Sequence, residues 1–203
     1  SYFAGLSDWC NCFKVAAEGP PGLWRTVFPA DATLAEEQIL SDAAVQQCMQ
    51  RFFPNDSFYE IIHRNIYTVH QRVAETFRKG RVLLAGDASH VNNPIGGMGL
   101  NGGIQDAANL CSKLITILQR QGDDSLLDLY SHQRRWVATE FVQQQSIANK
   151  RRLENSDAKK RQVNLDDLQR KAADKSLAKE FLLGTSMITS QRKAASLMLS
   201  QQQ

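Results

Sequence analysis

The chain has 203 residues, 42% of them hydrophobic, and a formal net charge of +3 at pH 7. That length supports one or two ordinary domains with a real core. No apolar stretch approaches the roughly 18 residues of a transmembrane helix, so a membrane span is excluded. The cysteines lack paired metal spacing, so we expect reduced structural thiols, no metal site and an intracellular, cytoplasmic protein by default; they are Cys10, Cys12, Cys48 and Cys111.

The first part of the chain predicts a hairpin followed by a helix. Residues 8–17 and 23–28 have the composition of strands. The Gly19-Pro20-Pro21-Gly22 cluster between them is typical of a turn. Ser41-Asp42 is a helix start, and this helix should end before Pro54.

Residues 58–77 alternate imperfectly between apolar and polar side chains. This pattern predicts one or two strands, which lead through Arg78-Lys79-Gly80 into the next element. His70 and Arg72 would then face either a pocket or the other side of the sheet, and the period-2 rule leaves both alternatives open.

The stretch from Gly80 to Leu114 joins a short strand to a long helix through a glycine-rich loop. Residues 81–85 fit a buried strand, which the Gly86-Asp87 turn ends. A helix should begin near Asn101. Its apolar positions follow a 3-and-4 spacing, which predicts one buried face; they are Ile104, Ala107, Ala108, Cys111, Leu114, Ile115 and Leu118.

The glycines of this loop point to ligand binding. Without a Cβ, they allow a ligand to approach main-chain N–H groups closely, and N–H groups at a helix start attract electron-rich atoms. Asp87 is available to accept hydrogen bonds from hydroxyls. A polyol that carries a redox ring would suit both ends of the loop. The glycines are Gly96, Gly97, Gly99, Gly102 and Gly103.

Residues 97–102 also satisfy G-x-G-x-x-G, the fingerprint of dinucleotide-binding folds. The true fingerprint turns directly from strand to helix and has an acidic residue at the end of a second strand. Here the strand ends near Gly86, well before Gly96, and helix follows. We therefore reject the nicotinamide-type reading.

The segment resembles a known family, the FAD-dependent aromatic-ring monooxygenases of the para-hydroxybenzoate hydroxylase type (group A flavoprotein hydroxylases). The resemblance rests on Gly-Arg-Val-Leu-Leu-Ala-Gly-Asp-Ala-Ser-His, residues 80–90, and on the continuation from Pro94 to Leu110. About 35 residues match tightly. A weaker resemblance at Gly22-Leu23-Trp24-Arg25 would place the early hairpin in a substrate-binding sheet.

The resemblance implies roles for individual residues. Asp87 should bind the ribityl hydroxyls of FAD, and Pro94 should lie beside the flavin ring. Asp106 and Asn109 should hold the loop, and His90 should pack below the flavin. The cofactor-binding set that we expect is Gly86, Asp87, Pro94, Gly96, Gly97, Met98, Gly99, Leu100 and Asn101; no side chain is expected to act as a catalytic group.

The same resemblance implies a reaction. NADH or NADPH would reduce FAD, O2 would add at flavin C4a, and the hydroperoxide would transfer one oxygen to a small aromatic or phenolic substrate. The implied fold class is α/β: an α+β substrate sheet joined to the C-terminal part of a Rossmann-like FAD-binding domain, with a helical tail. Other flavoenzymes of the superfamily, reductases or halogenases, remain alternatives.

Family members begin with a βαβ unit that binds the ADP half of FAD, and no such unit precedes Gly80. We therefore expect the chain to be a C-terminal half that needs its N-terminal half as a partner, and a fragment inactive alone is a further alternative. The expected organisation is a partial substrate-binding sheet in residues 1–79, the second FAD motif in 80–122 and a helical region in 123–203.

Residues 133–203 hold 14 Lys and Arg against 7 Asp and Glu. Clustered positive charge can indicate nucleic-acid binding. The basic clusters at residues 150–152 and 159–161 are interspersed with acidic residues and have no interleaved aromatic residues, so we favour a solvated helical surface and no nucleic acid. This region could join two copies in a homodimer or pack on the flavin domain, and its charge pattern does not choose between them.

Overall fold

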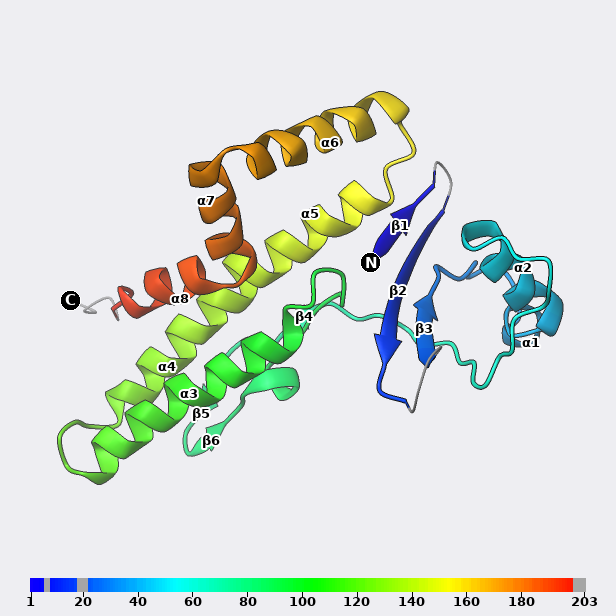
Figure 1. Ribbon diagram of the computed structural model, residues 1–203. Coiled ribbons are helices and arrows are strands. Elements are labelled where there is room, and N and C mark those ends of the chain that lie inside the picture. The colour runs from blue at the N-terminus through cyan, green and yellow to red at the C-terminus, as the bar shows by residue number, and fades with distance from the viewer. Residues whose placement is uncertain (6–7, 18–21, 199–203) are drawn as a thin grey trace. The chain divides into compact units, whose positions relative to one another are not determined.

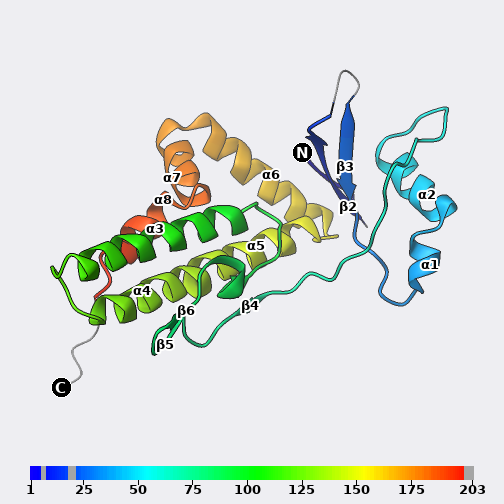
Figure 2. The same ribbon diagram turned by 90° about the horizontal axis from the view of Figure 1, so that it is seen from below.

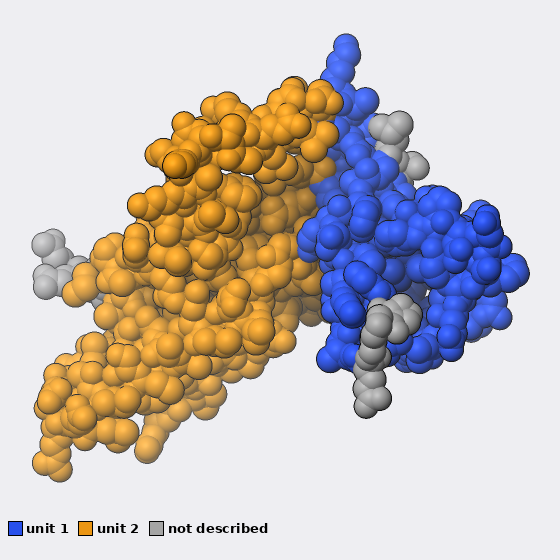
Figure 3. Space-filling view, in the orientation of Figure 1, with its two compact units in different colours: residues 1–68, 153–161 blue, residues 69–152, 162–203 orange. Residues whose placement is uncertain are grey.

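The computed structural model describes residues 1–5, 8–17 and 22–198. Helices and short strands make up these parts of the chain (Figure 1). The contacts divide them into two compact units, residues 1–68 with 153–161 and residues 69–152 with 162–203 (Figure 3). The turn predicted at Gly19-Pro20-Pro21 lies outside the described residues.

The first unit contains an antiparallel sheet in the order β1-β2-β3. Its strands are β1 (Tyr2–Ala4), β2 (Trp9–Val15) and β3 (Leu23–Val27). Asn11 pairs with Tyr2 on one side and with Val27 on the other. The predicted hairpin is therefore confirmed, although each strand is shorter than its predicted range.

Two helices follow the sheet, α1 (Glu36–Ile39) and α2 (Asp42–Phe52), and α2 lies beside β3 (Figure 2). The Ser41 hydroxyl accepts a hydrogen bond from the Ala44 N–H at 3.3 Å, so Ser41 is the predicted N-cap. Aromatic rings pack between α2 and the end of β3: the ring centroid of Phe52 lies 5.8 Å from that of Phe28, the residue after β3.

The strands predicted in residues 58–77 are largely wrong. Within this range the structure has only β4 (Arg72–Val73). The side-chain amide of Gln46 bonds both backbone groups of Tyr59, at 2.7 and 3.0 Å, where a neighbouring strand would do so. Phe58 and Ile62 are 85% and 67% exposed. A strand needs a partner for its N–H and C=O groups, and the described residues provide none along 60–71.

Short strands open the second unit. β5 (Arg78–Lys79) and β6 (Val82–Leu83) form a hairpin, and β4 pairs with β7 (His90–Val91). Gly80 has a φ of 60° at the first central position of the hairpin turn, which glycine adopts without strain. The predicted strand at 81–85 is thus shorter than expected, and a 3₁₀ turn, Gly86–Ala88, follows it.

Helices make up the rest, as the composition after Gly122 predicts. α3 (Gly99–Leu118) lies alongside α4 (Ser125–Trp136) (Figure 1). A π-helical segment, Val137–Gln143, continues α4 into α5 (Gln144–Leu153). The remaining helices are α6 (Ala158–Ala173), α7 (Lys175–Thr185) and α8 (Ile188–Ala195). No helix of the described residues is both long and apolar enough to cross a bilayer.

The rod formed by α4 and the π segment contributes to both core clusters of the second unit. Met98, Val137 and Met187 belong to one cluster, and Phe77 and Tyr130 belong to the other. Hydrogen bonds from α4 also hold the strands, because the Tyr130 hydroxyl donates to the Leu84 carbonyl at 2.6 Å. The short strands therefore depend on α4 for their position.

The buried face of α3 differs from the predicted one. Leu100, Ile104 and Leu118 are 77%, 59% and 81% exposed. The buried residues of the helix are Gly102 and Asp106. The reason is the ion pair of Asp106, which lies on the opposite side of the helix and turns that side toward α4. Of the predicted apolar positions Leu114 is half-buried and the others are exposed. The exposed ones together with Leu100 are called the outer face of α3 below: Leu100, Ile104, Ala107, Ala108, Cys111, Ile115 and Leu118.

We predict that Ser131→Ala destabilises the second unit. The Ser131 hydroxyl accepts from the buried Phe77 N–H at 2.9 Å, and its removal leaves that N–H without this acceptor. The expected loss is about 1–3 kcal/mol in the free energy of unfolding, measured with urea. His132→Ala, at the exposed neighbouring position, is the control. Equal losses in the two variants would contradict the assignment.

Candidate functional site

The Gly86–Asp87 turn lies against the first turns of α3. Gly86 has a φ of 59°. A Cβ added to Gly103 would lie 3.4 Å from the Cα of Gly86, so two glycines meet here backbone to backbone. Asp87 is exposed, and its carboxylate has no hydrogen bond or ion pair among the described residues. The turn therefore presents a carboxylate that a ligand can reach.

The loop between β7 and α3 is held by its own polar groups. The Asn93 side chain accepts from the Ile95 N–H at 3.0 Å, and the Gly97 N–H donates to the Pro94 carbonyl at 2.9 Å. Gly96 and Gly97 have φ values of 105° and 65°, which disfavour any side chain. These contacts define the backbone path that leads into the helix.

The start of α3 supplies main-chain donors. Gly102 donates its N–H to the Met98 carbonyl at 2.9 Å and so begins the helical ladder. The N–H groups of Gly99, Leu100 and Asn101 precede that ladder, at the positive end of the helix dipole. The helix begins at Gly99, slightly earlier than the predicted start at Asn101.

The expected cofactor-binding residues differ in exposure. Met98 is 2% exposed and its side chain belongs to the core, so it offers almost no surface to a ligand. Gly86 and Gly99 are half-buried. The exposed members of the set are Asp87, Pro94, Gly96, Gly97, Leu100 and Asn101.

The buried carboxylate of Asp106, a residue of α3, bonds both the Gly86–Asp87 turn and α4. Its Oδ2 accepts from the Gly86 N–H at 3.0 Å and lies 2.8 Å from His90 Nε2. Its Oδ1 accepts from Arg134 Nε at 2.6 Å, and Arg134 Nη2 also donates to the Gly102 carbonyl at 3.4 Å. Asp106 and Arg134 are 0% and 1% exposed. This group of residues is called the Asp106 cluster below.

Burial by itself raises the pKa of the Asp106 carboxyl. The His90 hydrogen bond and the Arg134 guanidinium outweigh burial, and the net result is a pKa below the ordinary value. The carboxylate is thus ionised and accepts only, so His90 must carry its proton on Nε2 and donate it. The Nδ1 atom of His90 is buried without a partner among the described residues.

Asp106 therefore holds the loop, as the resemblance implied, but Asn109 does not. Asn109 Nδ2 donates to Gln133 Oε1 at 3.2 Å, and Lys113 Nζ donates to the same oxygen at 2.9 Å. Burial, followed by the charge of Arg134, lowers the pKa of Lys113. Asn109 thus joins α3 to α4.

Sequence reasoning also missed two features of the site. Gly102 and Gly103 serve packing, because a Cβ at Gly102 would lie 3.3 Å from His90 Cε1 and Gly103 meets Gly86. Arg134 was not singled out at all. It lies far along the chain from Asp106, beside the similar Arg135, and nothing in its spacing marks it.

The other candidate residues do not form a second reactive centre. His63, His70 and Arg72 are exposed, and His90 is a structural part of the Asp106 cluster. The cysteines are free thiols, and burial raises the pKa of Cys10 to about 12. The described residues contain no group of three or more side chains suited to a metal.

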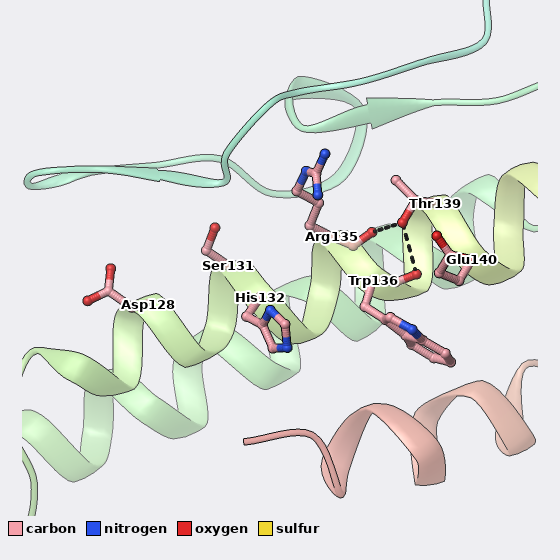
Figure 4. Close-up of a pocket in the computed structure, with 7 residues that line it drawn as sticks. All are labelled: Asp128, Ser131, His132, Arg135, Trp136, Thr139 and Glu140. Atoms are coloured by element: carbon pink, nitrogen blue, oxygen red, sulfur yellow. Dashed lines mark hydrogen bonds between the residues drawn. The ribbon is translucent and has the colours of Figure 1, made fainter. Parts of the chain in front are cut away.

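A separate cavity lies along α4 and the π segment (Figure 4). Two of its polar side chains are bonded within the fold: Asp128 pairs with Arg78 at 2.9 Å, and the Thr139 hydroxyl donates to the Arg135 carbonyl at 3.0 Å. Trp136 points toward α8, where Lys193 lies 5.2 Å from the ring centre. None of the expected FAD-binding residues lines this cavity.

We predict that the Asp106 cluster contributes to the pH dependence of stability. A carboxyl whose pKa is lower in the folded than in the unfolded state stabilises above the unfolded value, near 3.8, and this stability is lost as pH falls through the folded pKa. Urea unfolding of Asp106→Asn from about pH 6 to about pH 3 should show a flatter acid decline than the unsubstituted chain. Asp87→Asn, which removes an exposed carboxylate, should keep the decline; no difference between the variants would contradict the assignment.

Comparison with known proteins places this site in a family. Residues 18–145 match the FAD binding domain family, which is more than half of the chain. Para-nitrophenol 4-monooxygenase of Pseudomonas sp. (strain WBC-3) is 37% identical over 179 residues, 84% of this chain and 43% of that protein. A 3-(3-hydroxy-phenyl)propionate/3-hydroxycinnamic acid hydroxylase of Mycolicibacterium smegmatis is 40% identical over 121 residues, 60% of this chain and 22% of that protein.

A solved structure agrees with the sequence matches. The crystal structure of p-nitrophenol 4-monooxygenase PnpA from Pseudomonas putida DLL-E4 superposes with a TM-score of 0.73 at 34% identity, covering 82% of this chain and 43% of that one. The chain thus spans less than half the length of these relatives. The glycine-rich loop, the free Asp87 carboxylate and the matched range agree, and the chain belongs to the FAD binding domain family.

Proposed function

We propose that this chain is the C-terminal part of an FAD-dependent monooxygenase that hydroxylates an aromatic or phenolic substrate with NAD(P)H and O2. The observation that carries the proposal is the unpaired Asp87 carboxylate, held on a fixed turn beside the donor end of α3. The names of relatives support the reaction class, since para-nitrophenol 4-monooxygenase and 6-hydroxy-3-succinoylpyridine 3-monooxygenase are both monooxygenases of ring compounds.

The residues fit the polar parts of FAD. Asp87 would accept hydrogen bonds from the ribityl hydroxyls, and the N–H groups of Gly99, Leu100 and Asn101 would donate to the carbonyl oxygens of the isoalloxazine. Gly97 has open space around it, since a Cβ there would meet no atom within 4 Å, and Pro94 would lie beside the ring.

When bound, FAD would supply the redox chemistry between NAD(P)H, O2 and the substrate. The chain's own contribution is placement and electrostatics. Donors at the start of α3 would stabilise negative charge on the pyrimidine end of the ring, as in an oxyanion site. The proposal requires no nucleophile and no acid or base from the described residues. An intracellular location belongs to the same proposal, because NAD(P)H is an intracellular reductant.

We predict that Asp87→Ala weakens FAD binding about tenfold to a hundredfold, the value of one or two hydrogen bonds to a charged group. The measurement is a titration followed by the visible flavin absorbance. Asp123→Ala, at an exposed carboxylate of the second unit, is the control and should bind as the unsubstituted chain does. A flavin affinity unchanged in Asp87→Ala would overturn the site.

The substrate class has its own test. Flavin-loaded protein should oxidise NAD(P)H faster when a phenol such as para-nitrophenol is added, and it should release a hydroxylated product. Oxidation that no phenol stimulates would instead favour a reductase or halogenase of the same superfamily. The proposed organisation is a partial substrate sheet in residues 1–79, the FAD motif in residues 80–122 and a helical region in residues 123–203. In a homodimer, the helical region would join the two copies.

We also propose that the chain works together with an N-terminal half, which carries the ADP-binding βαβ unit. The outer face of α3 favours it, because Leu100, Ile104, Ile115 and Leu118 expose apolar surface along one stripe. The relatives are more than twice the length matched here. A βαβ sheet offers the apolar face that such a stripe needs.

We predict that the chain extended N-terminally by a βαβ unit binds FAD at least about tenfold more tightly than the chain alone, because only the extended form holds both halves of the cofactor. Ile104→Asp should remove this gain by placing a charge on the outer face. Val163→Asp on α6 is the matched control, since Val163 is 66% exposed and Ile104 is 59% exposed. An equal gain in both variants would contradict the role of the outer face.

A further inference from the structure

Two buried polar atoms of the Asp106 cluster lack a hydrogen-bond partner among the described residues. Besides His90 Nδ1, the Arg134 Nη1 atom is buried without a partner among the described residues. Unpaired buried polar atoms cost stability, and a buried ion pair is often no more stabilising than apolar side chains of similar size. Stability alone therefore does not explain why an arginine occupies this place on α4.

The geometry of the cluster offers another explanation. Arg134 reaches the site with two donors: Nε bonds Asp106 Oδ1, and Nη2 bonds the Gly102 carbonyl. It thus holds both the side chain and the backbone of the second turn of α3. Asp106 Oδ2 in turn accepts a hydrogen bond from the Gly86 N–H, so the position of the Asp106 side chain also fixes the turn. His90, stacked on Phe77 at 5.9 Å, fixes that oxygen from the side of β7.

We propose that Arg134 is a positioning residue of the flavin site, which acts through Asp106 to fix the Gly86–Asp87 turn against the start of α3. The Asp87 carboxylate and the N–H groups of Gly99, Leu100 and Asn101 then form one preorganised surface. The part of this inference that concerns flavin binding rests on the proposed function. The position of the turn can be measured without flavin.

Asp106→Asn is a sharp test because no orientation of the amide satisfies the cluster. With Nδ2 in the place of Oδ2, an N–H faces the N–H donor of Gly86. With Nδ2 in the place of Oδ1, an N–H faces Arg134 Nε. The variant nearly keeps the volume of the side chain, so its effect reports hydrogen bonding rather than a cavity.

The experiment compares Asp106→Asn, Arg134→Gln, Asp87→Asn and Arg135→Gln in the full chain. Arg135 is the neighbour of Arg134 and is exposed, so its variant makes the same chemical change outside the cluster. The first readout is hydrogen exchange of the Gly86 amide, with the amides of residues 115–118 as the reference within α3. The second is FAD affinity.

Asp106→Asn and Arg134→Gln should speed exchange at Gly86 about tenfold or more relative to Arg135→Gln, with little change at residues 115–118, and should weaken FAD binding. Asp87→Asn should weaken FAD binding while Gly86 stays protected. This separation of turn position from ligand contact is the signature of a positioning role.

Two results would overturn the inference: Gly86 exchange equal to that of Arg135→Gln, or an equal loss of protection throughout α3, which would make the cluster a general stabiliser. If Arg134→Gln does not fold, Arg134→Lys is compared with Arg135→Lys by the same criteria. If the unsubstituted chain binds no FAD, the site proposal fails for the chain alone, and the exchange data still decide the role of Arg134.

Discussion

The second unit depends on one buried carboxylate. Asp106 accepts from the backbone of the Gly86 turn, from His90 on β7 and from Arg134 on α4, so a single side chain of α3 joins the segment of residues 86–90 to α4. An ionised group at 0% exposure is tolerated only because each oxygen is paired. The glycines around it allow this approach, since a side chain at Gly103 would crowd Gly86.

This constraint also determines which side of α3 is buried. An amphipathic helix normally buries its apolar stripe. In α3 the polar side is inside, where Asp106, Asn109 and Lys113 meet α4, and the apolar stripe is exposed. The helix therefore has two different faces: the polar one packs against α4 within the described residues, and the apolar one is exposed there.

The sequence predicted the parts of the fold that rest on local signals. The hairpin of β2 and β3, the Ser41 cap and the existence of α3 followed from turn residues, capping and periodicity, and the structure confirms them. The family and its cofactor followed from the glycine-rich motif, and the family match confirms them. The assigned ligand contacts remain predictions.

What failed depended on partners distant in the chain. Residues 58–71 have strand-like periodicity but no ladder, because pairing is decided by a neighbour that periodicity does not reveal. The inner face of α3 was assigned from apolar spacing, and a buried ion pair overrode it. Arg134 could not be found from the motif, since its partner, Asp106, precedes it by 28 residues on a different helix.

The π segment of residues 137–143 has a consequence for how this fold tolerates change. Each residue added to or removed from a helix rotates everything that follows by about 100°. The segment lies between Arg134, which faces α3, and Asn149 of α5, whose amide would lie 2.6 Å from a Cβ at Gly96. Removing one residue from it would keep the Asp106 cluster but turn Asn149 away from the loop. Length in this short stretch is therefore constrained more tightly than residue identity, and insertions or deletions here would uncouple the position of the Gly86 turn from that of the loop at Gly96.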